Sequence, residues 1–315
     1  MSQLDVVVVG ELNVDLILQD LNSFPEMGKE KIARNMILTM GSASAILACN
    51  IARLGVKVGF IGQLGKDSYA NIVLGALQER GVDTGGVIQS DDALTGVTVA
   101  MSFPEDYAMV TYMGAMETFG ISGVDFDYLT KARHMHLSSY YLQPAMRKDC
   151  VELFRRAKEA GMTTSLDPGW DPEEVWSDDI LTLLPDVDLL LPNEHEAMNI
   201  AHKNTIDEAL VKLGRYSPNV VITLGSDGTV CSSGDQTYRT KTYNVTPVDT
   251  TGAGDSFNSG FIYRWLQGAE TSECLRAGSA CGALAVTRLG GITASPTPSE
   301  LISFLSEHTE DIFVS

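Results

Sequence analysis

The sequence is poor in basic residues. Of its 315 residues, 22 are Lys or Arg and 41 are Asp or Glu, which gives a formal net charge of −19. Binding to a nucleic acid or to an anionic membrane surface normally requires a basic face. The composition therefore predicts neither partner, although backbone amides can still bind the phosphates of a nucleotide.

Cysteine is scarce as well. The five cysteines are scattered, odd in number and never spaced as Cys-x-x-Cys, which is typical of buried free thiols in a reducing compartment. The opening residues MSQLDVVVVGEL lack a basic segment, and their apolar run is too short for a signal peptide or a membrane span. We expect a cytoplasmic protein.

What the sequence does contain is an alternation of short apolar runs and longer amphipathic segments. Strands are predicted to begin near Asp5, Val58, His134, Thr163, Asp186 and Asn219. Helices are predicted over 44–54, 67–80, 147–160, 255–266 and 272–287. This alternation is typical of a mostly parallel sheet with crossover helices.

Two stretches, 31–41 and 94–115, break the alternation because they read as strands without intervening helices. The second contains a Pro-Glu-Asp-Tyr turn, which predicts a hairpin. We expect these strands to form a small separate flap. Its apolar residues alternate at period two and predict an apolar face that needs a cover: Val97, Val99, Met101 and Phe103, then Met109, Thr111 and Met113.

The most informative motif is DTTGAGDSFNSG, at residues 249–260. We expect Gly252, Ala253 and Gly254 to form a turn into a helix that begins near Asp255. The N–H groups at such a helix start, with the helix dipole, form an anion site. The alternative is a tight turn in which Asp255 is a plain N-cap. A Rossmann oxidoreductase is disfavoured, because its fingerprint needs a glycine where Phe257 stands.

Two weaker motifs each allow two interpretations. In PNEHEA, Asn193 and Glu196 are either a capping box or groups that orient Mg²⁺ beside phosphates. In TLGSDGTV, Thr223, Gly225 and Gly228 either wall a nucleotide or form a hairpin turn.

Polar residues near two predicted strands raise similar questions. Asn13 and Asp15 alternate with apolar residues after the first strand, so both side chains point the same way, toward a ligand or toward solvent. His134 and His136 share one side of a strand. No further metal-ligand cluster stands near them in sequence, and we expect core or loop roles for both.

In this order, the motifs resemble those of the ribokinase-like (PfkB) carbohydrate kinases over essentially the whole chain. DTTGAGDSFNSGFI fits the family's C-terminal signature at every restricted position, and the family's N-x-x-E, T-L-G-x-x-G and A-V-T-R-x-G follow at 193–196, 223–228 and 285–290. The resemblance implies one α/β domain over 1–315. It would be a three-layer α/β/α sandwich with a mostly parallel sheet and a small β-flap (lid), whose strands come from about 12–40 and 94–115.

The resemblance also implies an activity, which is in-line transfer of a phosphoryl group from ATP to a hydroxyl of a small sugar or sugar-like acceptor. Asp255 would be the general base, and the amides of Gly252 to Asp255 the anion hole. The implied partners are Mg²⁺-ATP, K⁺ as a possible activator, a sugar or nucleoside acceptor, and a second copy of the chain bound through the lid.

The implied binding residues fall into three groups. The nucleotide group is Asn193, Glu196, Thr223, Gly225, Ser226, Gly228 and Ser279. The acceptor group is Asn13, Asp15, Gly41, Ser42, Ala45, Ile46 and Gln143. The monovalent-cation group is Asp249, Thr251, Ala285, Arg288, Gly290 and Ser295.

The acceptor end departs from the family. In MGSASAILACNIARLG, the family's G-G-x-x-x-N has lost one glycine, to Ser42 or Met40, and its sugar-binding Asn, to Ala45 or Ile46. We therefore expect poor use of free ribose and a preference for an acceptor with a deoxy or apolar edge, or for a nucleoside. A nucleoside kinase of the same fold and a catalytically silent ligand-binding relative are the alternatives.

A second departure lies at residues 166–171, where LDPGWD stands in place of the family's D-P-N-x-R. Gly169 and Asp171 replace the amide and the guanidinium. The loss of the Arg argues against a sugar phosphate as acceptor. Gln143 stands where ribose-specific members carry Glu, which is a further change in the sugar pocket.

Overall fold

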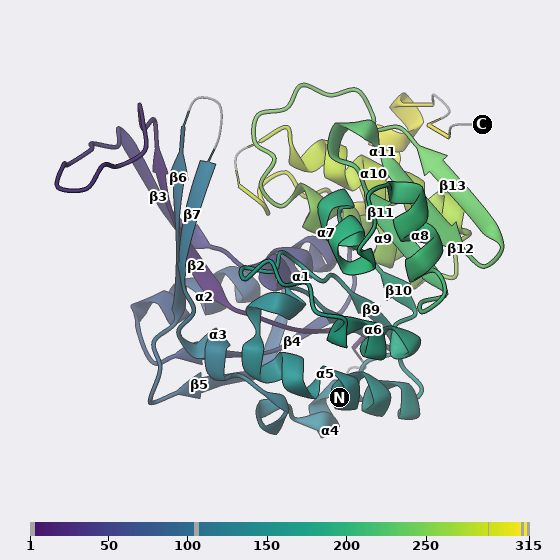
Figure 1. The fold of residues 1–315 in the computed structure, drawn as a ribbon, viewed down its shortest axis with the longest axis horizontal. Coiled ribbons are helices and arrows are strands. Elements are labelled where there is room, and N and C mark those ends of the chain that lie inside the picture. Colours follow the sequence, from purple (N-terminus) through teal and green to yellow (C-terminus); the bar gives the residue numbers. More distant parts are fainter. Residues whose placement is uncertain (1–3, 104–106, 289, 310–311, 314–315) are drawn as a thin grey trace.

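The computed structural model describes residues 4–103, 107–288, 290–309 and 312–313. Within them, one large sheet has the strand order β13-β12-β11-β10-β9-β8-β1-β4-β5 (Figure 1). The bounds are Val6–Val9 (β1), Val58–Gly65 (β4), Asp83–Ser90 (β5), His134–Leu137 (β8), Thr163–Leu166 (β9), Leu189–Leu190 (β10), Asn219–Thr223 (β11), Thr229–Ser233 (β12) and Gln236–Thr240 (β13). The strands from β11 to β5 are parallel, and β12 and β13 form an antiparallel edge.

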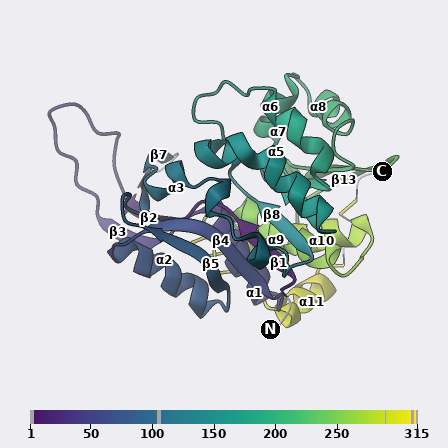
Figure 2. The ribbon, with the colours of Figure 1, turned by 90° about the horizontal axis from the view of Figure 1, so that it is seen from below.

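Helices cover both faces of this sheet, which makes three layers (Figure 2). Their bounds are Ala43–Arg53 (α1), Ser68–Glu79 (α2), Ala115–Thr118 (α3), Phe126–Leu129 (α4), Pro144–Glu159 (α5), Asp179–Leu183 (α6), Glu194–Ala201 (α7), Ile206–Leu213 (α8), Ala253–Trp265 (α9), Thr271–Ala285 (α10) and Pro298–Glu307 (α11). None of these helices is long and apolar enough to cross a membrane, as far as the chain is described.

The two faces of the sheet have separate cores because side chains alternate along β1. Val7 and Val9 pack with the buried residues of α5 to α8. Val6 and Val8 pack with those of α1, α2, α9 and α10. The predicted α/β/α sandwich is therefore confirmed, and its buried central strand accounts for the unbroken valine run.

A second sheet, here called the lid, stands at one side of the molecule (Figure 1). Its strands are β2 (Asn13–Gln19), β3 (Asn35–Met40), β6 (Gly96–Ser102) and β7 (Tyr107–Tyr112), in the order β3-β2-β6-β7. β3, β6 and β7 lie in the two stretches where the sequence predicted a flap, and β2 lies in the wider range 12–40 that the family resemblance implied. Residues 104–106 of the predicted turn lie outside the described residues.

The strand register corrects the apolar face predicted for the lid. Paired residues of neighbouring strands share a face, and Val99 pairs with Leu16 and Val110. Met109 and Thr111 pair instead with Ala100 and Thr98, on the opposite face. The two predicted apolar sets are thus on different faces, because period two alone fixes no register between strands.

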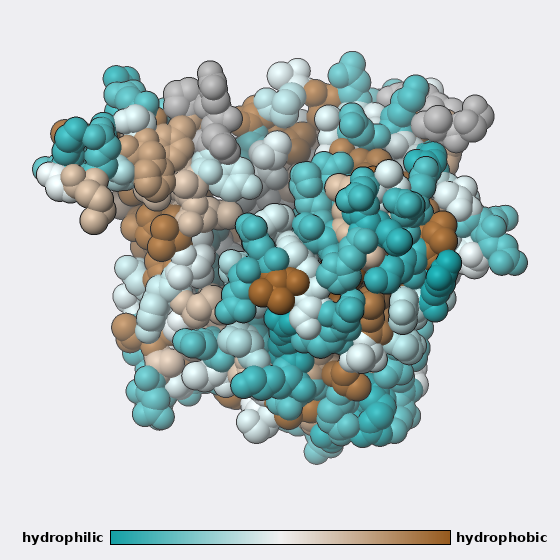
Figure 3. Space-filling model, in the orientation of Figure 1, coloured by the Kyte–Doolittle hydropathy of each residue, from teal (hydrophilic) through white to brown (hydrophobic). Residues whose placement is uncertain are grey.

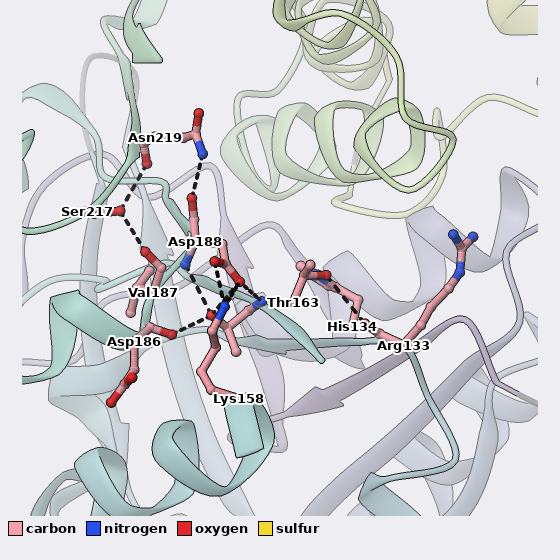
Figure 4. Close-up of polar contacts among 10 residues, drawn as sticks. Arg133, His134, Lys158, Thr163, Asp186, Val187, Asp188, Ser217 and Asn219 are labelled. Atoms are coloured by element: carbon pink, nitrogen blue, oxygen red, sulfur yellow. Dashed lines mark hydrogen bonds and ion pairs between the residues drawn. The ribbon is translucent and has the colours of Figure 1, made fainter. Parts of the chain in front are cut away.

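The starts of β9, β10 and β11 are joined through one residue, Asp188, which bonds with both its carboxylate and its backbone carbonyl (Figure 4). Both oxygens of Asp188 accept hydrogen bonds from Lys158 Nζ at 2.7 Å, and Oδ2 also accepts from the Thr164 N–H at 2.8 Å. Asn219 Nδ2 donates to the Asp188 carbonyl at 2.8 Å. Because β10 has only two residues and pairs with β9 and β11 over these alone, the bonds of Asp188 add to a short ladder.

We expect Asp188→Ala to lower the free energy of unfolding by about 2–3 kcal/mol, because a charged acceptor is removed from the Thr164 amide and from Lys158. Lys158→Met should cost less than about 1 kcal/mol, since this ion pair is partly exposed. Urea unfolding of both variants measures the difference. Equal losses would show that the ion pair, and not the backbone bond, holds β10.

Candidate active site

A cavity of about 150 Å³ opens at the carboxyl ends of β9, β10 and β11, where the start of α9 meets them. Its walls bring together residues far apart in the sequence: Asp167, Leu191, Asn193, Glu196, Thr223, Thr250, Gly252, Ala253, Gly254, Asp255 and Asn258. The predicted phosphate-binding turn, the N-x-x-E pair and Thr223 therefore meet in one place.

Helix α9 begins two residues earlier than the sequence predicted. Gly252 is its N-cap, with a left-handed φ of 71°, and Ala253 is its first residue. Asp255 is the third helical residue, so the alternative in which it is a plain N-cap is wrong. No side chain caps this end of α9. The Ala253 N–H donates to the Thr250 carbonyl at 3.2 Å, and Gly254 and Asp255 line the cavity, so the positive end of the α9 dipole lies at the cavity wall.

Asp255 lies on the cavity wall among other carboxyl groups. Loss of water contact, and then the negative charges of Asp167, Glu11 and Glu196, raise the pKa of Asp255 well above its ordinary value. A carboxylate with raised proton affinity, held beside uncapped helix N–H groups, is suited to take a proton from a hydroxyl.

Glu196 is both a helix cap and a cavity residue, so the two interpretations of N-x-x-E are not alternatives. Its carboxylate accepts from the Asn193 N–H at 2.9 Å and from Asn193 Nδ2 at 2.7 Å, while Asn193 Oδ1 accepts from the Glu196 N–H. Burial, then the charge of Asp167, raise the pKa of Glu196 to about 8.

Asp167 was missed by the sequence reasoning. It follows β9, accepts from Asn258 Nδ2 at 2.8 Å and from the Gly169 N–H at 3.0 Å, and faces the cavity. Burial raises its pKa to about 7. An Asp-Pro directly after the predicted strand TTSL, like the Pro-Asn-Glu after DLLL, was the available signal.

The sequence reasoning also missed Glu11, which is buried behind the residues that line the cavity. Its carboxylate accepts from the Ser44 N–H at 3.2 Å and from the hydroxyls of Ser42 at 3.2 Å, Ser139 at 3.1 Å, and Ser44. Burial raises its pKa. Because Ser42 and Ser44 open α1, Glu11 ties the end of β1 to the start of that helix.

Asn13 and Asp15 belong to the lid strand β2 and not to the end of the first strand. Their predicted common direction is confirmed, because Asn13 Nδ2 donates to Asp15 Oδ1 at 3.0 Å and to Thr98 Oγ1 at 3.1 Å. Burial raises the pKa of Asp15 to about 6. A Cβ atom on Gly41 would overlap the Asp15 carboxyl, so any other residue there would displace this side chain.

The altered residues of the acceptor motif have distinct places. Ser42 keeps a left-handed φ of 75° as the N-cap of α1, a conformation that glycine adopts without strain. Ala45 is fully buried below this cap. Ile46 packs against Gly252 and Gly291, so the apolar surface that replaces the family's Asn lies beside the α9 turn.

Gln143 precedes α5 and is buried. Its Nε2 donates to the carbonyls of Ser138 at 2.7 Å and Ser139 at 3.3 Å, while Oε1 has no partner among the described residues. His134 and His136 form a buried hydrogen-bonded chain through the Ser165 hydroxyl of β9, and burial lowers both pKa values to about 3. The core role predicted for the two histidines is confirmed.

The remaining nucleotide-group residues do not line this cavity. Gly225, Ser226 and Gly228 form the turn from β11 to β12, and a Cβ atom on Gly228 would overlap the Thr240 carbonyl oxygen. The hairpin interpretation of this turn is therefore sufficient for its glycines. Ser279 is buried within α10.

The predicted monovalent-cation residues gather around two loops. Partial burial raises the pKa of Asp249, but hydrogen bonds outweigh it and the pKa is lowered. The donors are the N–H groups of Gly290, at 2.8 Å, and Thr251, at 2.9 Å. Ser295 Oγ is buried and has no partner in the described chain. Ala285 ends α10, and the Arg288 side chain is exposed. An unpartnered hydroxyl oxygen fits a cation that prefers oxygen ligands.

The fold defines a ribokinase-like α/β protein. The family model for the pfkB carbohydrate kinases matches residues 3–298, and the chain belongs to that family. It is 29% identical to a ribokinase of Haemophilus influenzae over 96% of this chain and 98% of the relative. It is 30% identical to an ATP-dependent ribose-1-phosphate kinase of Halopiger xanaduensis, with the same coverages.

The solved structures agree with this assignment. An Arabidopsis thaliana ribokinase complexed with ribose and ATP superposes with a TM-score of 0.86 at 25% identity. The match covers 96% of this chain and 99% of that one.

The crowded carboxyl groups predict an unusual pH dependence of stability. A carboxyl with a raised folded-state pKa binds more protons when folded, so its contribution to stability is lost as pH rises through that pKa. We expect the melting temperature to fall from about pH 6.5 to about pH 8, because over this range the folded protein keeps a proton on Glu196 that the unfolded chain has lost. His134 and His136 act in the opposite sense, but only below the ordinary histidine pKa of about 6.5.

Glu196→Gln should flatten this decline, because glutamine does not titrate. Glu194→Gln is the matched control: it lies on the same helix with its side chain 40% exposed, and it should keep the wild-type slope. Differential scanning calorimetry across the pH range measures all three proteins. A slope unchanged by Glu196→Gln would show that this carboxyl is already ionised at pH 6.5.

Proposed function

We propose that the protein is an ATP-dependent kinase that transfers the γ-phosphoryl group in line to a hydroxyl of a small sugar or sugar-like acceptor. The observation that carries the proposal is the position of Asp255 at the uncapped start of α9, in the cavity that Glu196 and Asp167 also line. Membership of the pfkB family supports the reaction class.

In the proposed reaction, Asp255 accepts the proton of the acceptor hydroxyl as that oxygen attacks phosphorus. The raised pKa of Asp255 favours this transfer. The N–H groups of Gly254 and Asp255, with the α9 dipole, stabilise the charge on the transferring phosphoryl oxygens. Asn193, Thr223 and the turn 225–228 hold the nucleotide, and Ser279 is assigned to its binding by resemblance.

Glu196 and Asp167 are the residues that fit Mg²⁺. They are carboxyl groups in the cavity whose pKa values are raised, so a nearby cation would relieve their repulsion. Mg²⁺ usually keeps several waters and binds through one or two carboxylates and the phosphates. When bound, it would neutralise phosphate charge. K⁺ is included in the proposal, with Asp249, Thr251, Ala285, Arg288, Gly290 and Ser295 as its site.

The acceptor lies, in this proposal, between the lid and the start of α1, against Asp15, Asn13, Gly41 and Ser42, with Gln143 behind. Glu11 and Asp15 bring negative charge to this side. At residue 171, Asp stands where the family carries the Arg that would pair with a phosphate. This favours an uncharged polyol or nucleoside over a sugar phosphate.

Asp255→Asn tests the catalytic assignment. Asparagine keeps the size and the helix position, so the fold should be retained, while kcat should fall about 10²–10⁴-fold because the base is lost. ADP release is measured with a panel of sugars and nucleosides. If no acceptor stimulates ADP release by the wild type, the chain is a silent ligand-binding relative. If Asp255→Asn keeps a near-wild-type kcat, Asp255 is not the catalytic base.

We also propose a homodimer in which two lids cover each other's apolar faces. On the face that holds Val99, four further apolar side chains remain 38–62% exposed: Met36, Leu38, Val110 and Tyr112. Brown and tan surface covers much of the lid, at the upper left of Figure 3. An apolar sheet face of this kind usually meets a partner.

Val99→Asp with Met101→Asp should give a monomer with a raised acceptor KM, because two charges are placed on the covered face. Thr111→Asp is the matched control on the opposite face and should leave the dimer intact. Sedimentation at micromolar concentration measures the state of each protein. A monomeric wild type would contradict the dimer.

A further inference from the structure

The loop at residues 290–295 follows α10 and lies directly on the turn that opens α9. A Cβ atom on Gly252 would come within 2.7 Å of Gly291 Cα, and one on Gly291 would come within 2.8 Å of Ile46 Cδ1. Ile46, Gly291 and Gly252 are therefore stacked with no space for a side chain between the backbones. The position of the Gly252 turn depends on where this loop is held.

Side chains of α1 and of the residue that ends α2 hold the loop. In the described residues its backbone makes one internal bond, from the Thr293 N–H to the Gly290 carbonyl at 3.3 Å. Three side chains each donate to a different loop carbonyl: Asn50 Nδ2 to Gly291 at 3.1 Å, Arg80 Nη2 to Ile292 at 2.9 Å, and Arg53 Nε to Ser295 at 2.6 Å.

Asn50 also reaches the helix that carries Asp255. Its Nδ2 donates to the Ser256 hydroxyl at 2.9 Å, so one buried amide joins the loop to α9. Asn50 is 1% exposed, and its Oδ1 has no partner in the described chain. An unpaired buried oxygen lowers stability, and an apolar residue would suit the sequence ASAILACNIAR better. The buried Asn50 amide therefore lowers the stability of the fold, which points to a role other than packing.

Arg80 directs its charge at the same loop. Its Nη1 is buried without a partner, and no carboxylate lies within ion-pair distance of it among the described residues. Arg53, which holds the same loop, also pairs with Glu300 at 3.7 Å, whereas Arg80 bonds a loop carbonyl. Both Asn50 and Arg80 thus fix the segment 291–292 that presses on Gly252.

We propose that Asn50 and Arg80 are positioning residues for phosphoryl transfer. They hold the segment 291–292 against Gly252 and so fix the α9 N–H groups at the place where the transferring phosphoryl group is received. The inference rests on the proposed function. Neither side chain is proposed to touch a substrate, and a shift of about 1 Å in such groups is enough to lower a rate about 10²-fold.

Asn50→Leu and Arg80→Met test the role. We expect kcat to fall about 10–100-fold with acceptor KM changed less than about twofold, and Asn50→Leu to unfold at no lower urea concentration than the wild type. Arg80→Lys should recover part of kcat, since it restores a charged donor. Arg133→Met is the control, because that guanidinium bonds the Leu266 carbonyl at the other end of α9, and its kcat should be unchanged.

A second measurement does not need the acceptor. Binding of Mg²⁺-ADP is measured by calorimetry with and without aluminium fluoride, which mimics the transferring phosphoryl group. Aluminium fluoride should lower the Kd of Mg²⁺-ADP for the wild type. In Asn50→Leu and Arg80→Met this effect should be lost, while the Kd of Mg²⁺-ADP without aluminium fluoride stays at the wild-type value.

Each other outcome is decisive. Wild-type tightening and wild-type kcat in both variants would overturn the inference alone. Equal loss of plain ADP binding and of tightening would also overturn it, because that result indicates a general structural role. No tightening in the wild type itself would contradict the proposed function, and the inference with it.

Discussion

The fold has to hold four carboxyl groups at one edge of the large sheet and a fifth, that of Asp15, on the adjoining lid strand, and most of the site follows from that constraint. Three of them are each paired with one asparagine: Asp15 with Asn13, Asp167 with Asn258, and Glu196 with Asn193. A neutral amide donates to a carboxylate without cancelling its charge. The repulsion between the carboxylates therefore remains, and binding of a cation or a proton would relieve it, as the raised pKa values indicate.

The three-layer architecture explains how such a group of charges persists in a stable domain. The carboxyl groups lie at strand ends and helix starts, while β1 and its neighbours form an apolar slab with a core on each face. Polar bonds at the opposite edge, such as those of Asp188, fix the short strand β10 that leads to Asn193. The rigid sheet sets the distances between carboxyl groups, so the local cost of repulsion does not unfold the elements that carry them.

The sequence predicted the layers, the small sheet and most of the cavity, because apolar periodicity and the motif at 249–260 are local signals. It could not predict the two faces of the lid, since the pairing of Val99 with Val110 depends on a register that only the assembled sheet fixes. The start of α9 was placed two residues late because Gly252 adopts a left-handed φ, which no spacing rule specifies. Glu11, Asp167 and Asn50 are single polar residues, and their roles come from partners more than thirty positions away.

Four connections join the lid to the body, and two of them are hydrogen-bonded to each other. Three residues separate β1 from β2, and two separate β3 from α1. Each of these two connections contains one member of a bonded pair, since the Ser42 hydroxyl donates to the Glu11 carbonyl at 2.6 Å. The Glu11–Ser42 pair therefore couples the entry of the chain into the lid to its return into the body, so the backbone position of β2 and the start of α1 are fixed relative to each other.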